Sequence, residues 1–206
     1  ADEVITGFHR TGGMLGSDTC GLRPDLISMA KALSAGYLPI GAVMISDEIH
    51  EVLVEGSRRF GMFGHGFTYS GHPVSCATAL KNIEIMERED LLGNAATVGD
   101  YFLDQLTGLE ALPLVGQVRG RRLMVCVENV ANKATKAPLP DEVNESKRIS
   151  NLCEEMGLIV RPMGHLNVMS PPLVITTENV DFVVETLGKA IARVTDELVR
   201  EGHRIG

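Results

Sequence analysis

The sequence predicts an α/β fold, and three observations support this class. Two short apolar runs, Leu26 to Ala30 and Gly41 to Ser46, each have the length of one buried strand. Helical apolar patterns alternate with such runs, for example from Val74 to Glu87 and from Asp141 to Met156. Asp2 stands where a parallel strand is expected to end, and open α/β sheets place ligand-binding groups at such ends.

Composition and charge exclude several classes of protein. With 206 residues the chain forms one large domain or two small ones, and its 44% hydrophobic content is ordinary for a globular protein. The net charge of −8 argues against nucleic-acid binding, because the short basic segments around Arg58 and Arg121 form no basic stripe. No apolar run approaches the roughly 20 residues of a membrane-spanning helix, so no membrane role is expected.

The cysteines bear on redox compartment. Cys20, Cys76, Cys126 and Cys153 are far apart and form no C-x-x-C pair, which indicates neither a disulfide framework nor a zinc site. No signal peptide precedes Ala1. We therefore expect reduced thiols and a cytoplasmic protein.

The first segment carries a candidate ligand-binding carboxylate. The carboxylate of Asp2 can hydrogen-bond a protonated pyridine nitrogen, although taken alone Asp2 is more simply interpreted as a residue that caps a turn. Val4 points to the same side if the chain is extended, and could pack flat against a ring. The following loop from Gly7 to Gly13 lacks the P-loop pattern, and His9 is expected to be partly exposed within it.

Lys31 stands directly after the first apolar run. We expect it to be partly desolvated, which penalises the charged amine and lowers its pKa. A neutral amine can attack an aldehyde to form an imine. Taken alone, a lysine at this place is more simply interpreted as a solvated loop residue.

The next segments lead to a candidate phosphate-binding hydroxyl. Asp47 is expected to cap a short helix from Glu48 to Val54, and the glycine-rich stretch from Glu55 to Gly66 is expected to be a surface loop at a site rim or subunit contact. Pro73 fits a first helical position, so Thr68 lies near a helix N-terminus. Exposed amides and a hydroxyl there can hold a phosphate, and simple helix capping is the alternative.

The remainder of the chain predicts a helix-flanked, mainly antiparallel domain. Its expected elements are a helix from Leu91 to Leu112 ended by Pro113, strand alternation from Val115 to Val127, a linker from Pro138 to Pro140, a helix from Asp141 to Met156, a strand from Leu158 to Val160, a turn and short strand from Ser170 to Thr176, and a final helix capped by Thr176 or Thr177 and ending near Glu201.

Arg161 directly follows the expected strand that ends at Val160. A planar guanidinium can hold a carboxylate through two parallel hydrogen bonds, so arginine suits recognition of an amino acid or keto acid. By itself, an arginine at a strand end is more often a surface residue.

Four motifs follow one another along the chain. They are Ala1 to Gly12, Pro24 to Tyr37, Gly64 to Pro73, and Arg161 to Gly164 together with Ser170 to Thr176. In this order they resemble the class III, or omega, aminotransferases, which use pyridoxal 5'-phosphate (PLP). The resemblance covers essentially the whole chain.

The resemblance implies a PLP-dependent transferase of fold type I. Residues 1–90 would be the C-terminal part of the large, mostly parallel-sheet PLP-binding domain, and residues 91–206 a connecting helix and the small C-terminal α/β domain. Members of the family are considerably longer, and their first half holds a phosphate-binding turn and an aromatic residue that stacks on the cofactor. We therefore interpret the chain as a C-terminal half, which is expected to be inactive by itself.

The resemblance also assigns roles. Lys31 would be the catalytic lysine that holds PLP, Asp2 would bind the ring nitrogen and Val4 would support the ring face. Thr68 would reach the PLP phosphate of the neighbouring subunit, which implies a homodimer with shared sites. Arg161 would face a substrate carboxylate or swing aside for an uncharged amine. The implied reaction moves an amino group from an amine or omega-amino acid to a keto acid such as pyruvate.

Two departures and two alternatives accompany this interpretation. The family usually has glycine where His9 and Arg122 stand, which changes the site entrance locally in the first case and the packing in the second. One alternative is another PLP reaction on the same residues, by an aminomutase such as the glutamate-1-semialdehyde type or by a decarboxylase. The other is a non-enzymatic, dimerising fragment.

Overall fold

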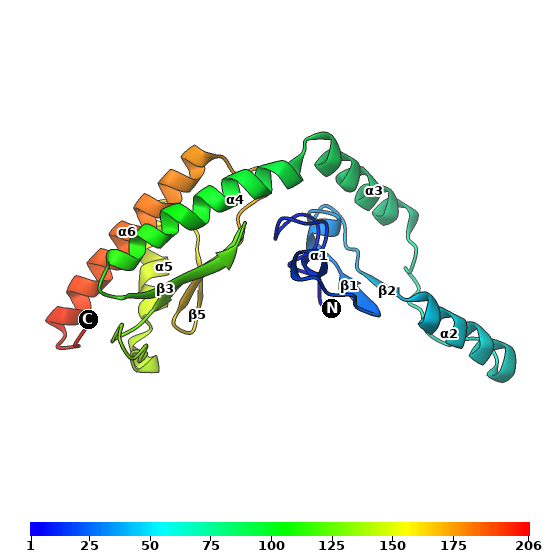
Figure 1. Cartoon of the computed structure of the whole chain (residues 1–206), viewed down its shortest axis with the longest axis horizontal. Coiled ribbons are helices and arrows are strands. Elements are labelled where there is room, and N and C mark those ends of the chain that lie inside the picture. The colour runs from blue at the N-terminus through cyan, green and yellow to red at the C-terminus, as the bar shows by residue number, and fades with distance from the viewer. The chain divides into compact units, whose positions relative to one another are not determined.

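A computed structural model describes residues 1–206 and divides them into two compact units, Ala1–Leu92 and Gly93–Gly206. We call them unit 1 and unit 2 and describe each by itself (Figure 1). None of the helices is both long enough and apolar enough to span a membrane.

Unit 1 contains a small sheet and three α-helices. Its elements are α1 (Gly16–Cys20), β1 (Leu26–Met29), the 3-10 helix η1 (Lys31–Leu33), β2 (Ala42–Ile45), α2 (Asp47–Phe60) and α3 (Pro73–Arg88). The strands β1 and β2 pair antiparallel, with Leu26 opposite Ile45. Parallel pairing, which was expected to dominate, is limited to one bridge between Asp2 and Ser28.

The prediction of two buried strands is wrong in this chain. Every residue of β2 is exposed, including Val43 at 66% and Met44 at 55%. In β1 the residues are exposed or half-buried. An apolar run favours a strand, but burial also requires an element that packs over it, and unit 1 places none on β2.

Helix α2 differs from its prediction at both ends. Ser46, not Asp47, is the N-cap, and its hydroxyl accepts a hydrogen bond from the Ile49 amide at 3.4 Å. The helix continues to Phe60, through residues expected to form a loop, and ends before Gly61. Arg58 and Arg59 lie in the last turn, where cations interact favourably with the helix dipole. No residue of α2 is buried.

Helix α3 agrees with its prediction. His72 is its N-cap and Pro73 its first residue. Proline suits the first position because it has no amide hydrogen that would be left unpaired there. The buried apolar residues of unit 1 are few and come from three segments of it: Phe8, Leu33, Ala79 and Met86.

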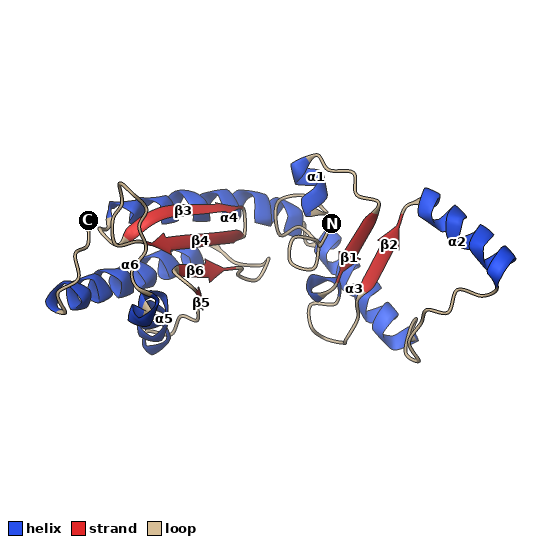
Figure 2. Cartoon of the chain, turned by 90° about the horizontal axis from the view of Figure 1, so that it is seen from below, coloured by secondary structure: helices blue, strands red, loops and turns tan.

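Unit 2 contains one antiparallel sheet and its helices. Its elements are α4 (Leu91–Thr107, whose first two residues belong to unit 1), η2 (Gly108–Ala111), β3 (Val115–Arg121), β4 (Met124–Asn129), η3 (Asp141–Val143), α5 (Glu145–Glu155), β5 (Arg161–Met163), β6 (Leu166–Met169) and α6 (Thr177–Arg200). The strand order is β3-β4-β6-β5, and every neighbouring pair is antiparallel (Figure 2). This confirms the predicted antiparallel character.

The helices of unit 2 bury continuous apolar stripes. On α4, Val98 is 7% exposed and Phe102 and Leu106 are fully buried, as their helical spacing predicted. On α6, Leu187 and Ile191 are likewise fully buried, and Thr176 is the N-cap. Together with the strands these side chains form a single core.

The predicted strand from Leu158 to Val160 is wrong, because this segment hydrogen-bonds to α5 instead. The Leu158 amide donates to the Cys153 carbonyl at 2.8 Å, and the Ser150 hydroxyl donates to the Val160 carbonyl at 2.6 Å. The strand begins one residue later, so Arg161 lies in β5 and does not follow a strand. The segment from Ser170 to Thr176 forms no strand.

Candidate active site

Asp2 lies beside β1 and keeps one carboxylate oxygen free. Its Oδ1 accepts hydrogen bonds from the Val4 amide at 3.0 Å and from the Ser28 hydroxyl at 3.4 Å. The side chain is exposed, and its Oδ2 makes no hydrogen bond within the chain. The first contact is an Asx-turn, which fixes the carboxylate while leaving an oxygen available for a ligand donor.

Val4 does not have the extended geometry that was expected. The chain turns at this residue, and the Gly7 amide donates to the Glu3 carbonyl at 3.0 Å. Val4 is half-buried. The alternation that places residues 2 and 4 on one side of a strand therefore does not apply here.

Glu3 is a buried carboxylate whose importance the sequence did not indicate. It is 2% exposed and accepts hydrogen bonds from the amides of Gly16 at 2.7 Å and Ser17 at 2.6 Å, and from the hydroxyls of Ser17 and Thr6. Burial tends to raise the pKa of this carboxyl, but the donors from Ser17, Thr6 and Gly16 outweigh it and hold the pKa below its usual value. Glu3 thereby joins the N-terminal segment, which bridges to β1 at Asp2, to the start of α1.

Lys31 opens η1 with an unusual backbone. Its φ is +44°, in the left-handed region that non-glycine residues rarely adopt. The side chain is exposed, and its amine makes no hydrogen bond or ion pair within the chain. The predicted partial desolvation of Lys31 is therefore wrong for this chain, since no element of unit 1 covers the end of β1.

Helix α3 reaches the turn that follows Lys31. The side-chain amide of Asn82 donates to the Ala32 carbonyl at 2.7 Å and to the Leu33 carbonyl at 3.3 Å. Sequence reasoning missed this contact. The available signal was an asparagine in a helix interior, where its propensity is poor.

Thr68 lies in the turn that precedes α3. It is exposed, and its hydroxyl makes no hydrogen bond within the chain. The turn is held by the Phe67 amide, which donates to the Ser70 hydroxyl at 3.0 Å, and by the Ser70 amide, which donates to the Phe67 carbonyl at 2.9 Å. Thr68 therefore does not cap α3, and its hydroxyl is free for a ligand.

His9 is not the partly exposed residue that was expected. It is 6% exposed, its φ is +73° and its Nδ1 has no hydrogen-bond partner. Burial lowers the pKa of the imidazole, although the charges of Glu87 and Asp90 act in the opposite direction. The positive φ explains physically why a glycine suits this position.

Arg122 has the same backbone signature in unit 2. Its φ is +54°, in the turn between β3 and β4. Its guanidinium pairs with Asp100 and donates to the Ala96 carbonyl at 2.7 Å, both on α4. The departure from glycine thus adds contacts to a helix and touches none of the other predicted site residues.

Arg161 is exposed in β5, opposite Val168 of β6, and its guanidinium makes no hydrogen bond or ion pair within the chain. The hairpin that carries it is anchored to α5. The Ser146 hydroxyl donates to the Gly164 carbonyl, and His165 Nδ1 lies 2.8 Å from a carboxylate oxygen of the buried Glu145. Arg161 belongs to unit 2, whereas the other predicted site residues belong to unit 1.

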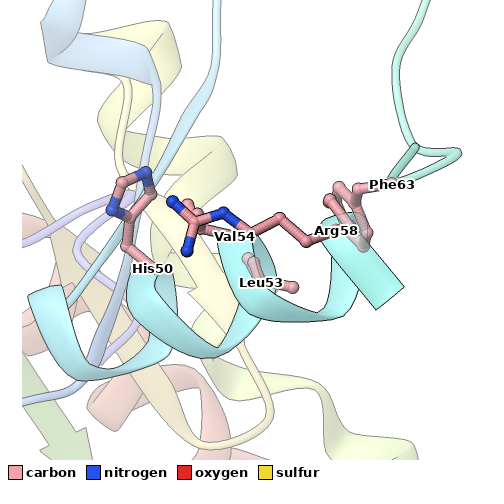
Figure 3. A pocket seen from close by; sticks show the side chains of 6 residues that line it. His50, Leu53, Val54, Arg58 and Phe63 are labelled. Carbon is pink, nitrogen blue, oxygen red and sulfur yellow. The ribbon is translucent and has the colours of Figure 1, made fainter. Parts of the chain in front are cut away.

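A shallow depression on α2 contains none of the predicted residues. Five of its six lining residues belong to this one helix, and the sixth, Phe63, follows it; they are His50, Leu53, Val54, Ser57, Arg58 and Phe63. Figure 3 shows the Arg58 side chain running back along the helix. Because one exposed helix face supplies most of its wall, we assign this depression no part in the site.

The comparisons with known proteins cover almost the entire chain. The family described as Aminotransferase class-III matches residues 1–191. An uncharacterized aminotransferase of Sinorhizobium fredii is 45% identical over 100% of this chain and 44% of its own length. A probable gamma-aminobutyrate transaminase 4 of Oryza sativa is 43% identical over 97% of this chain and 41% of its own.

Solved structures of transaminases also match almost the entire chain. An (S)-enantioselective omega-transaminase from Thermomicrobium roseum matches with a TM-score of 0.88 and 44% identity, over 94% of this chain and 42% of that one. The PMP-bound form of an aminotransferase from Vibrio fluvialis matches with a TM-score of 0.93 and 39% identity, over 96% and 44%. The chain thus spans less than half the length of these relatives.

Proposed function

Because this chain belongs to the class III aminotransferase family, which is PLP-dependent and of fold type I, we propose that it supplies the lysine and the carboxylate-reading arginine of a transaminase. The reaction moves an amino group from an amine or omega-amino acid to a keto acid such as pyruvate. One observation carries this proposal. Lys31, with its free amine and left-handed backbone, and Asp2, with its free carboxylate oxygen, are attached to the same short strand. Backbone strain of this kind concentrates at functional sites.

The donor set of unit 1 fits PLP. Lys31 would bind the aldehyde carbon, the free oxygen of Asp2 would accept a hydrogen bond from the ring nitrogen, and Val4 would contact the ring. When bound, the ring withdraws electrons from the carbon that bears the amino group. Once a substrate amine has displaced it from the aldehyde carbon, the Lys31 Nζ would take the proton from the substrate carbon and deliver it to the former aldehyde carbon of the cofactor.

Two polar residues would bind the remaining charges. The free Thr68 hydroxyl, beside the N-terminus of α3, would hold the phosphate. We propose that it does so across an isologous homodimer. Arg161 would hold the substrate carboxylate through paired hydrogen bonds.

We also propose that units 1 and 2 correspond to the two expected domains, at 1–90 and 91–206. The exposed Lys31, Asp2 and Thr68 are in contact with solvent in this chain. Since water competes for every one of these groups, the chain by itself would be inactive, and the activity belongs to the longer protein or to this chain with a partner that covers them.

The first test locates the lysine. The protein is incubated with PLP, reduced with borohydride and digested, and the pyridoxyl peptide is identified by mass spectrometry. We expect modification at Lys31, and its loss in Lys31→Ala. Lys81→Ala is the matched control, since Lys81 is an exposed lysine of unit 1 paired with Glu84. Equal modification of Lys31 and Lys81 would contradict the proposal.

The second test concerns the reaction and its substrate. With the longer protein, or with this chain and a partner that covers its site, an amine donor and pyruvate should yield alanine; product formation without alanine from any donor would favour an aminomutase or a decarboxylase. Arg161→Ala should raise KM for acidic substrates about 10- to 100-fold, the equivalent of a charged hydrogen bond, and leave neutral amines nearly unchanged. Arg119→Ala in β3 is the control, because Arg119 pairs only with Glu128.

A further inference from the structure

The backbone at Lys31 needs external support. A left-handed conformation costs a non-glycine residue about 1–2 kcal/mol, and Lys31 has a φ of +44°. The preceding Ala30 is extended, with φ −163° and ψ −148°, and the chain turns into η1 at Lys31. Such a conformation persists only where surrounding contacts hold it.

Within the turn itself there is little to hold it. Helix η1 has three residues, and its two internal contacts run from the Leu33 amide to the Ala30 carbonyl at 2.9 Å and from the Ser34 amide to the Lys31 carbonyl at 3.2 Å. The carbonyls of Ala32 and Leu33 have no such partner. The last carbonyls of a helix need partners from outside the helix, and side chains or water supply them.

Asn82 supplies the missing partners from a helix 50 residues away in the chain. Its amide nitrogen lies 2.7 Å from the Ala32 carbonyl oxygen and 3.3 Å from that of Leu33, and a carboxamide has the two hydrogens that two such bonds require. No other side chain donates to this turn. Leu33 is 8% exposed, so the contact lies at a buried edge of unit 1.

We propose that Asn82 is a positioning residue for Lys31: it fixes η1 so that the lysine keeps its left-handed backbone and presents its amine in one direction. The proposal rests on the proposed function of Lys31. Without the two hydrogen bonds, the φ of Lys31 can relax to a negative value. This change rotates the Cα–Cβ bond of Lys31 and points the amine in another direction. Holding η1 in this way requires a side chain with amide hydrogens at position 82.

Two substitutions at Asn82 distinguish the loss of the hydrogen-bond donor from a change in side-chain shape. Asn82→Asp keeps the shape but places carboxylate oxygens against two carbonyl oxygens, and Asn82→Leu removes the polarity. The matched control is Asn94 on α4, whose amide donates in the same way to the carbonyls of Leu173 at 2.6 Å and Ile175 at 3.1 Å in unit 2. Asn94→Leu therefore removes an equivalent pair of hydrogen bonds in unit 2, to carbonyls that are not part of the Lys31 turn.

The first readout needs no cofactor. Hydrogen exchange of the Leu33 and Ser34 amides should accelerate at least about tenfold in Asn82→Leu, the equivalent of one lost hydrogen bond, and more in Asn82→Asp. Asn94→Leu should leave these two amides unchanged. Unchanged exchange in both Asn82 variants would overturn the proposal.

The second readout follows PLP incorporation at Lys31, trapped with borohydride and counted against Lys81 in the same sample. The Asn82 variants should lower the rate at Lys31 about tenfold and leave Lys81 unchanged, whereas Asn94→Leu should alter neither. Equal losses in the Asn82 and Asn94 variants would show a general folding effect and overturn the proposal. If the unsubstituted protein does not favour Lys31 over Lys81, the proposed function fails, while the exchange experiment still decides whether Asn82 holds the turn.

Discussion

Units 1 and 2 differ sharply in what they bury. Unit 1 carries four of the five predicted site residues, yet its buried apolar side chains are only Phe8, Leu33, Ala79 and Met86. Unit 2 carries the remaining one, Arg161, and contains the whole of the continuous core. Since buried apolar area is the main source of folding free energy, we expect most of the stability to come from unit 2, whereas most of the predicted site residues lie in unit 1.

The difference also concerns exposed apolar side chains. In unit 1 the strand β2 and the end of α2 expose Val43, Met44 and Phe60, the last at 79%. Polar contacts of single residues, such as those of Glu3 and Asn82, therefore have a larger share in holding unit 1 than they would in a well-packed domain.

The largest expected effect is in the core of unit 2. Leu187→Ala should lower the free energy of unfolding by about 2–5 kcal/mol, because the side chain is fully buried and its removal leaves a cavity. Val43→Ala, at a 66% exposed position of unit 1, should change it by less than about 1 kcal/mol. Urea unfolding followed by circular dichroism measures both. Similar losses would mean that the two units unfold as one and share their stability.

The next largest effect should be a difference in thiol reactivity between the cysteines of the two units. Burial raises the pKa of Cys153 in α5 to about 11, and the residue is fully buried, so little thiolate is present or accessible at pH 8. Cys20 in unit 1 is exposed. Iodoacetamide should alkylate Cys20 at least about 100-fold faster in the native protein, as quantified by peptide mass spectrometry. Comparable rates would show that α5 opens readily.

Glu3 should make unit 1 sensitive to acid. Its folded pKa is depressed, so the folded state binds fewer protons than the unfolded state, and the stabilisation is present above the ordinary value of about 4.3 and lost as the pH falls below it. At pH 7, Glu3→Gln should destabilise unit 1 by about 1–3 kcal/mol, and the difference should shrink by pH 3.5. Urea titration followed by NMR signals of Gly16 and Ser17 measures this. A difference that is independent of pH would show that the charge of Glu3 is not involved.

The smallest effects concern the two left-handed positions. His9→Gly should stabilise unit 1 by about 1 kcal/mol, since it relieves the backbone and removes a buried unpaired nitrogen. Arg122→Gly should be nearly neutral, because the same relief is offset by the lost contacts with Asp100 and Ala96. The free energy of unfolding measures both, and a larger gain for Arg122→Gly would reverse this order.

The pH dependence of the His9 effect gives an independent check. The folded pKa of His9 is depressed by burial, so the unfolded state binds the proton more readily, and stability should fall as the pH drops below about 6.5. His9→Gly should lack this component. An identical pH profile in both proteins would mean that His9 is protonated without opening.

The sequence predicted the elements that local signals determine. The apolar stripe of α4, the proline at the start of α3 and a threonine cap on α6 all depend on residues within a few positions of each other, and all were confirmed. Of the two threonines that the sequence offered for this cap, the structure uses Thr176 and not Thr177. The strand at Leu158 to Val160 was predicted wrongly, because its carbonyl and amide groups bind α5 and not a neighbouring strand. That choice depends on tertiary contact, which an apolar run does not reveal.

The candidate site shows the same limit. The motifs picked out Lys31 and Asp2, and the structure attaches both to β1. The exposure of Lys31, the burial of His9 and the contact of Asn82 all depend on what lies across from them in space, so the sequence around each residue could not indicate them.

The Glu3 carboxylate closes the loop between Glu3 and Ser17 and so restricts the backbone within it. Its bonds to the Ser17 amide join positions 14 residues apart, so the intervening chain forms a non-covalent ring. Within a closed ring one dihedral angle cannot relax unless others compensate, and Phe8 and His9, with φ of +59° and +73°, both lie inside it. The left-handed conformations of Phe8 and His9 therefore allow the ring to close. Substitutions at Glu3 and His9 should consequently have non-additive effects on the free energy of unfolding.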